Sequence, residues 1–137
     1  MRKLKVLIVD ESAFFRTWFG KLILAIPEIQ IIGEAKDPLS ALRFMRKAKP
    51  DAIIIDSKTR KRFGIDVLKH LRVAAPVPKV IMLTSDIYFR YRHNVSEKGD
   101  FLLNKFTEYQ KIPEILKRFA LSSAPECKSP GPGFLGV

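Results

Sequence analysis

The apolar residues of this chain fall into short continuous runs that alternate with stretches of helical periodicity. A run without polar interruption is typical of a strand buried on both faces, whereas apolar residues at every third or fourth position indicate the buried side of a helix. The pattern of strand followed by helix occurs five times along the chain. The runs predicted as strands are residues 5–9, 29–35, 52–55, 80–83 and 101–103.

Capping residues and prolines predict where the first two helices begin and end. Ser12 is a predicted N-cap for the first helix, which Pro27 closes, and Asp37 before Pro38 starts the second. Both helices are expected to turn an apolar stripe toward the core. The stripe residues are Phe14, Phe15, Trp18, Phe19, Leu22, Ile23 and Ile26 in the first helix, and Leu39, Leu42, Phe44 and Met45 in the second.

Three further helices follow in the second half of the chain. One is predicted after Gly64, and a more polar one over residues 87–97. The last is predicted over residues 113–119, after a capping box that pairs Thr107 with Gln110. Alternating strands and helices of this kind predict an α/β fold, a doubly wound parallel sheet covered on both faces.

The chain divides into one folded domain and a tail. Residues 1–121 hold all the predicted elements, and residues 122–137 are rich in Ser, Pro and Gly without periodicity, so they are predicted to be disordered. In doubly wound sheets the functional crevice lies at the carboxyl ends of the strands. The residues that follow each strand are therefore the candidates for a functional site.

Polar side chains end four of the five predicted strands: Asp10 with Glu11, Asp56, Thr84 and Lys105. Carboxylates at one sheet edge repel each other unless a cation neutralises them, and oxygen ligands at a shallow edge suit Mg²⁺. A carboxylate there could form an aspartyl-phosphate, with the metal ion, the lysine and the hydroxyl neutralising the phosphoryl oxygens. The simpler alternative is that the first two acids only cap a helix.

These spaced residues resemble the response-regulator receiver family over about residues 4–121. The stretch Asp56-x7-Gly64-Ile65-Asp66-Val67-Leu68 has the family's spacing, and residues 104–109 look like a subgroup of single-domain receivers. The resemblance implies a flavodoxin-like (βα)5 fold with strand order 2-1-3-4-5. It also implies that Asp56 is the phosphoacceptor.

The resemblance further implies a Mg²⁺ site. Glu11 and Asp56 would ligate the ion directly, together with the backbone carbonyl of Lys58, and Asp10 would act mainly through a bound water. Lys105 would contact Asp56 before phosphorylation and the phosphoryl oxygens after it. These residues are the metal ligands and the cationic partner that the family's reaction needs.

By the same resemblance, Thr84 would move toward the phosphoryl group and transmit the signal.

Three features depart from the family pattern. Phe106 replaces the usual proline after the lysine, Leu102 replaces a common aromatic residue, and residues 58–62 form a basic loop. The departures keep a second interpretation open, in which the chain is a receiver-like interaction module that works without phosphorylation.

The leading interpretation is a single-domain response regulator of a two-component phosphorelay. It would take its phosphoryl group from a sensor histidine kinase or phosphotransfer protein, with no enzyme activity beyond its own phosphorylation and dephosphorylation. Because little sequence follows Leu121, its output would be binding to a downstream protein. The test of the alternative is whether Asp56 accepts a phosphoryl group at all.

The net charge of +11 suggests acidic partners, but no nucleic-acid motif accompanies it, so nucleic-acid binding is not expected. No apolar run is long enough to insert into a membrane. Asp10 and Glu11 interrupt the first apolar run too early for a signal peptide, and the single cysteine, Cys127, offers no disulfide framework. A cytoplasmic location is the resulting expectation.

Overall fold

The computed structural model of the chain describes residues 2–57, 69, 77–86 and 100–122. The predicted helices after Gly64 and over residues 87–97, the basic loop 58–62 and the predicted tail from residue 123 onward lie outside the described residues. Within the described part, no helix is long and apolar enough to cross a membrane.

A five-stranded sheet forms the centre of the fold, in the order β2-β1-β3-β4-β5, and every neighbouring pair is parallel. This confirms the predicted architecture and strand order. Central strands buried on both faces need continuous apolar runs, and β3 and β4 supply them over residues 52–55 and 80–83. The strands are β1 (Leu4–Val9), β2 (Ile29–Ala35), β3 (Ala52–Asp56), β4 (Lys79–Thr84) and β5 (Phe101–Asn104).

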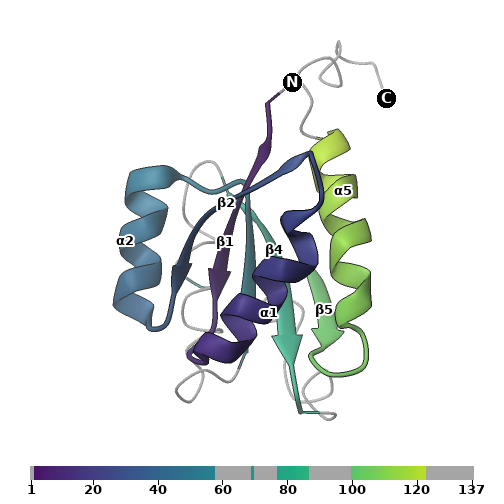
Figure 1. The fold of residues 1–137 in the computed structure, drawn as a ribbon. Helices are drawn as coiled ribbons and strands as arrows, with labels where there is room; N and C mark the ends of the chain where they lie inside the picture. The colour runs from purple at the N-terminus through teal and green to yellow at the C-terminus, as the bar shows by residue number, and fades with distance from the viewer. Residues whose placement is uncertain (1, 58–68, 70–76, 87–99, 123–137) are drawn as a thin grey trace.

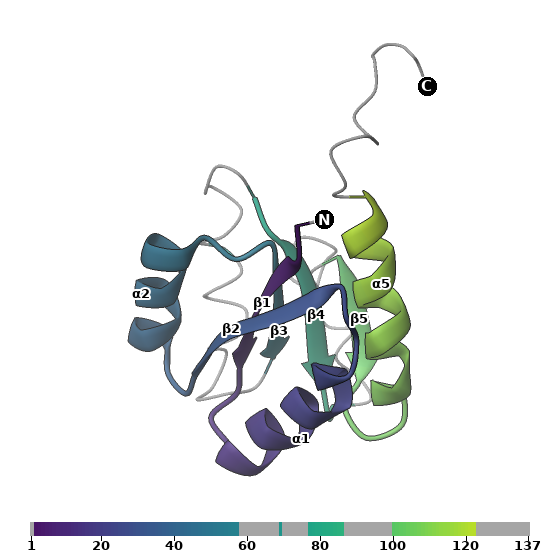
Figure 2. The same ribbon diagram turned by 45° about the horizontal axis from the view of Figure 1, so that its top comes forward.

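Helices cover both faces of the sheet. Helices α1 (Ala13–Leu24) and α5 (Ile112–Ser122) lie on one face, and α2 (Pro38–Ala48) lies on the other (Figures 1 and 2). A short 3-10 helix, η2 (Tyr109–Lys111), precedes α5. Each face has its own apolar core. On one face, α1 contributes Phe19 and Ile23, and α5 contributes Leu116 and Phe119. On the other face, α2 contributes Ala41, which packs with the strand residues Ile53, Ile55 and Met82.

The predicted starts of α1 and α2 are confirmed. The Ser12 hydroxyl accepts a hydrogen bond from the Phe15 N–H at 3.4 Å, and the Asp37 carboxylate accepts one from the Ser40 N–H at 2.8 Å. Each cap satisfies an N–H that has no partner within its own helix. Lys49 is the C-cap of helix α2. Its φ of 48° lies in the left-handed region and turns the chain toward β3.

For three residues of the predicted apolar stripes, the expected burial is wrong. Phe14, Trp18 and Leu39 are 64%, 43% and 58% exposed. On a helix of 3.6 residues per turn, Phe14 and Trp18 fall at one edge of a stripe that already spans half the circumference. Leu39 falls well away from Ala41, which is fully buried and occupies the core position instead.

The predicted capping box of Thr107 and Gln110 is also wrong, because the 3-10 helix begins after Glu108 without a side-chain cap. Asn104 organises the turn instead: its side-chain oxygen accepts hydrogen bonds from the N–H groups of Phe106 and Thr107, at 2.9 and 3.1 Å. Glu108 returns to accept a bond from the Asn104 N–H at 2.8 Å. The turn after β5 is therefore held from both of its ends.

At the amino-terminal edge of the sheet, Asp51 fastens β1 beside β3. Its carboxylate accepts hydrogen bonds from the Arg2 guanidinium at 2.9 and 3.0 Å and from the Lys5 N–H at 2.8 Å. Partial burial alone would raise the pKa of Asp51, but these bonds and the charges of Arg2 and Lys5 outweigh it and hold the pKa below its usual value. The ionised form of Asp51 is thus favoured by folding.

Candidate functional site

Three of the predicted site residues meet at the carboxyl edge of the sheet. Asp10 follows β1, Asp56 ends β3 and Lys105 follows β5. The Lys105 ammonium lies 2.7 Å from Asp10 Oδ2 and 2.6 Å from Asp56 Oδ2, within hydrogen-bond distance of both. The three side chains are only 4%, 12% and 6% exposed, respectively. One ammonium therefore bonds two adjacent carboxylates, and its single charge offsets only one of theirs, in a site nearly closed to solvent.

Asp10 is the most deeply placed acid of the site. Burial raises the pKa of Asp10, and the hydrogen bond from Lys105 and the Ser12 N–H bond, at 2.8 Å, oppose that rise only in part. Arg16 of α1 donates to the Asp10 backbone oxygen at 2.7 Å and also pairs with Glu34 of β2 at 3.1 Å. The loop between β1 and α1 is thereby tied to two secondary-structure elements.

Lys105 is positioned by its backbone as well as by its charge. Its N–H donates to the Thr84 carbonyl at 2.8 Å, which extends the pairing of β4 and β5 by one residue. Its ammonium also lies 3.9 Å from the centroid of the Phe15 ring, a cation–π contact from α1. The lysine head thus has two carboxylates and one aromatic face as neighbours.

Thr84 and Ser57 are two buried hydroxyl residues at the same edge of the sheet. Thr84 is buried, and its hydroxyl oxygen accepts a hydrogen bond from the Asp86 N–H at 3.1 Å. Ser57 is also buried, its N–H donates to the Leu83 carbonyl at 2.8 Å, and its hydroxyl makes no hydrogen bond to the described residues. Two buried hydroxyl groups therefore lie where β3 and β4 end, at the same edge of the sheet as the acids.

Glu11 lies beside Asp10 on the exposed side of the loop, and Lys58 lies outside the described residues. Within the described part of the chain, no three acidic, histidine or cysteine side chains converge into a metal-binding group. Mg²⁺ does not need such a group, because it keeps several waters and binds through one or two carboxylates plus a phosphate. The hard oxygen donors Asp10, Glu11 and Asp56 fit that chemistry.

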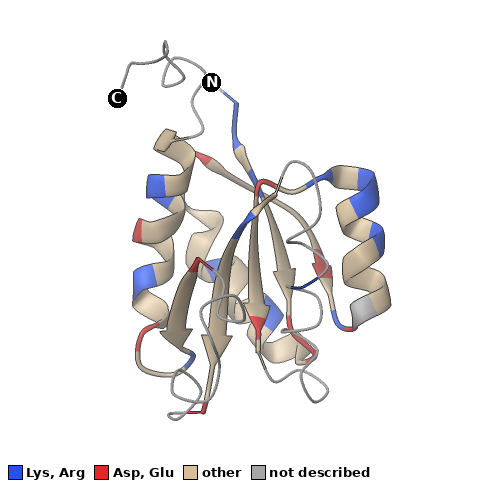
Figure 3. Cartoon of the chain, turned by 180° about the vertical axis from the view of Figure 1, so that it is seen from behind, with Lys and Arg blue, Asp and Glu red and all other residues tan. Residues whose placement is uncertain are grey.

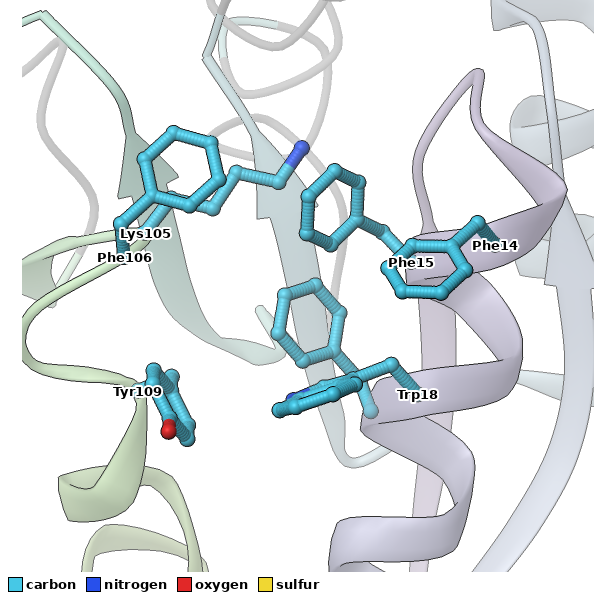
Figure 4. Close-up of a pocket in the computed structure, with 7 residues that line it drawn as sticks. Phe14, Phe15, Trp18, Lys105, Phe106 and Tyr109 are labelled. Carbon is cyan, nitrogen blue, oxygen red and sulfur yellow. The ribbon is translucent and has the colours of Figure 1, made fainter.

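An apolar pocket opens beside Lys105, between α1 and the turn after β5 (Figure 4). Its volume is about 250 Å³. Aromatic rings from both segments line it, with the aliphatic stem of the lysine: Phe14, Phe15, Trp18, Phe19, Lys105, Phe106 and Tyr109. Phe14, Trp18 and Phe106 are its exposed members, and the first two are the apolar residues of α1 that the core does not bury.

Charge is distributed unevenly over the fold. Figure 3 shows acidic positions where strands end at the lower edge, and basic positions along α2 and α5. Helix α2 contains no acidic residue, while Arg43, Arg46 and Lys47 are all exposed on it. The acidic site thus lies within a basic protein, which favours the approach of an anionic group.

Comparison with known proteins agrees with this geometry. The family model described as the response regulator receiver domain matches residues 6–117, most of the chain. The chain belongs to the response regulator receiver family. The family resemblance predicted from the sequence is thus confirmed, and with it the assignment to two-component systems.

Curated relatives of this receiver include the protein-glutamate methylesterase/protein-glutamine glutaminase of Pyrococcus horikoshii. It is 38% identical over 84 residues, which cover 61% of this chain and 23% of the relative. A protein of the same name from Vibrio vulnificus is 36% identical over 83 residues, covering 61% and 24%. The chain thus spans about a quarter of the length of these relatives.

Solved structures show the same receiver fold. The response regulator domain of Thermotoga maritima CheB has a TM-score of 0.71 at 28% identity, over 90% of this chain and 100% of that one. The signal receiver domain of NarL from Mycobacterium tuberculosis has a TM-score of 0.76 at 19% identity, over 88% and 98%. The second likeness supports the fold alone.

Sequence reasoning missed two residues of this receiver's site, Phe15 and Arg16. Phe15 was assigned only to the core, although its position five residues after Asp10 places it on the first helical turn, where its ring contacts Lys105. Arg16 received no role. A basic residue one turn into a helix that follows an acidic loop can reach back to that loop, and this spacing was the available signal.

Proposed function

We propose that this chain is a single-domain response regulator whose Asp56 accepts a phosphoryl group from a sensor histidine kinase or phosphotransfer protein in the cytoplasm. The observation that carries the proposal is the buried pairing of Lys105 with Asp56 and Asp10 at 2.6 and 2.7 Å. An anionic nucleophile beside a fixed cation is the arrangement that phosphoryl transfer requires. The phosphorylated form would then bind a downstream protein.

In the proposed reaction, Asp56 Oδ attacks the phosphorus of a phosphohistidine. A P–O bond to Asp56 forms while the P–N bond to the imidazole breaks, and the leaving nitrogen takes a proton from solvent. Lys105 holds the carboxylate before the reaction and neutralises the phosphoryl oxygens after it. Thr84, at the end of β4, would supply a hydroxyl donor to the same oxygens.

Mg²⁺ supplies neutralisation of the transferred group when it is bound. In this proposal Glu11 and Asp56 would hold the ion together with the backbone carbonyl of Lys58, and Asp10 would act through a water. Arg16 keeps the loop that carries Asp10 and Glu11 in place through its 2.7 Å bond to the Asp10 carbonyl. The chain would catalyse only its own phosphorylation and dephosphorylation.

Acetyl phosphate with Mg²⁺ tests the proposal directly. Intact mass spectrometry should show the gain of one phosphoryl group in the wild type, no gain in Asp56→Asn, and loss of the gain when EDTA is added. Asp51→Asn is the matched control, because it changes a carboxylate at the opposite end of β3. A gain in Asp56→Asn equal to that of the wild type would refute the assignment.

The second candidate is an interaction module that works without phosphorylation. The exposed aromatic residues around the pocket favour it, because exposed apolar patches mark binding surfaces. This candidate predicts no mass gain in the wild type under any Mg²⁺ concentration. The same acetyl phosphate experiment therefore separates the two functions.

A further inference from the structure

Lys105 has a neighbour that phosphoryl transfer itself does not use. Its ammonium lies 3.9 Å from the Phe15 ring centroid, while Asp10 and Asp56 occupy its other sides. A cation above an aromatic face is attracted by the ring's quadrupole, and the attraction is stronger where water is excluded. Lys105 is only 6% exposed. The ring therefore helps to fix the ammonium in a closed site.

Phe15 also belongs to a continuous set of aromatic contacts that reaches the surface. Its ring centroid lies 5.7 Å from that of Phe106 and 5.2 Å from that of Phe14. Phe14 in turn lies 6.0 Å from Trp18, and Trp18 packs edge-on against Tyr109 at 5.7 Å. Figure 4 shows these rings facing one another across the pocket from α1 and from the turn after β5.

We call Phe14, Trp18, Phe106 and Tyr109 the aromatic surface. Phe15 connects it to the site, because Phe15 contacts Lys105 on one side and Phe14 and Phe106 on the other. Phe106 is also the residue next to Lys105 in the chain. A displacement of the lysine head therefore acts on this surface through its contact with the Phe15 ring.

Phosphorylation of Asp56 would produce such a displacement. The carboxylate oxygen that carries the new P–O bond loses its charge, and about two negative charges appear on the phosphoryl oxygens beyond it. The ammonium follows that charge outward, and its distance to the Phe15 ring then changes. A ring freed from its cation repacks against Phe14 and Phe106.

We propose that Phe15 is a positioning residue for Lys105 and that their contact makes the aromatic surface sensitive to phosphorylation of Asp56. The inference rests on the proposed function, since it needs a phosphoryl group on Asp56. It goes further by naming the side chain that transmits the event and the surface that responds. A partner that binds this surface would distinguish the two forms of the protein.

Trp18 is the only tryptophan of the chain, so its fluorescence reports on the aromatic surface alone. The experiment follows Trp18 emission and acrylamide quenching after addition of acetyl phosphate and Mg²⁺, with the phosphorylated fraction measured by intact mass. The variants are Phe15→Leu, which keeps an apolar side chain without a ring, and Phe15→Tyr, which keeps the ring. Phe14→Leu is the matched control, because Phe14 is an aromatic neighbour with no contact to Lys105 among those described.

In the wild type, emission and quenching of Trp18 should change in proportion to the phosphorylated fraction. At an equal phosphorylated fraction, Phe15→Leu should lose this change, and its phosphorylation rate should fall by about 2- to 30-fold, the range expected for a lost cation–π contact. Phe15→Tyr, which keeps the ring, should show the wild-type Trp18 change and the wild-type phosphorylation rate. Phe14→Leu should phosphorylate at the wild-type rate.

Mass gain in the wild type without a change in Trp18 would overturn the inference and leave the proposed function standing. So would a Phe15→Leu variant with wild-type rate and wild-type fluorescence change. Absence of mass gain in the wild type would overturn both. Far-UV circular dichroism checks folding, and Phe15→Met replaces the leucine variant if that variant is unfolded, with the same expected outcome.

Discussion

Replacing Lys105 by methionine tests the electrostatics of the site through stability alone. Methionine keeps most of the aliphatic stem that lines the pocket and removes the charge. Asp10 and Asp56, at 4% and 12% side-chain exposure, then lie next to each other without the ammonium that bonds both of them. A buried charge that loses its partner is strongly destabilising, because water does not replace the lost bonds.

The expected loss follows from that burial. Removing one partner of a buried ion pair costs about 3–5 kcal/mol, and we expect a value near the lower end, about 3 kcal/mol, because Asp10 can take up a proton instead. For a chain of this size the loss should lower Tm by about 10 °C. Lys111→Met is the matched control. Lys111 pairs with Glu108 at 2.9 Å but is 61% exposed, so its loss should cost less than about 1 kcal/mol.

The pH dependence gives the sharper test. Burial already raises the pKa of Asp10, and Lys105 is among the groups that oppose the rise, so removing Lys105 raises that pKa further. A carboxyl whose pKa is higher in the folded state binds its proton there first. The unfolding free energy of the variant therefore recovers as pH falls from neutral toward the ordinary aspartate pKa of about 3.9.

The assay is urea denaturation followed by far-UV circular dichroism, at pH 7.5 and at pH 5, for the wild type and both lysine variants. The deficit of Lys105→Met should be largest at pH 7.5 and smaller at pH 5. A deficit equal to that of Lys111→Met at pH 7.5, or one that grows toward acid, would show that the carboxylates do not depend on Lys105.

Two further stability predictions concern other parts of the sheet. Asp51→Asn should lower the unfolding free energy by about 1 kcal/mol at neutral pH. Because Arg2 and Lys5 lower the pKa of Asp51, this stabilisation is present above the ordinary aspartate pKa and is lost in acid. Urea titrations of the wild type and the variant should therefore converge as the pH falls below about 4. Gly33→Ala would place a Cβ in collision with the Phe44 ring, and it should cost about 1–3 kcal/mol by overpacking. Thermal denaturation of the double variant with Phe44→Leu should recover part of that loss, and no recovery would indicate another cause.

The fold could be predicted because each element carries a local signal that tertiary packing does not contradict. The apolar runs of β3 and β4 have no other use than burial on both faces, and Ser12 and Asp37 make the hydrogen bonds that helix starts require. Parallel strands also bring their carboxyl ends to one edge. The meeting of Asp56 with Lys105 therefore follows from order and topology.

The aromatic surface could not be predicted, because periodicity does not distinguish a core residue from an exposed apolar residue at the edge of the same stripe. Phe14 and Trp18 have the spacing of core residues. Only the position of the turn after β5 decides that Trp18 contacts Tyr109 and that both rings line a pocket with Phe106. The hydrogen bonds by which Asn104 organises the turn after β5 could not be predicted for a related reason. Thr107 and Gln110 fit a capping motif, but a cap needs the helix to begin there, and it begins after Glu108.

The pairing of Lys105 with Asp10 has a consequence for the order of events during folding. The two residues are 95 positions apart, and Lys105 and Asp56 are 49 apart, so the site contains some of the most non-local contacts of the chain. Contacts of this range form late, because the entropy of closing a long loop must be overcome first. A chain that has assembled β1 and β3 but not β5 holds two neighbouring carboxylates without their lysine. Under the proposed function, phosphoryl acceptance would thereby be limited to molecules that have completed the sheet.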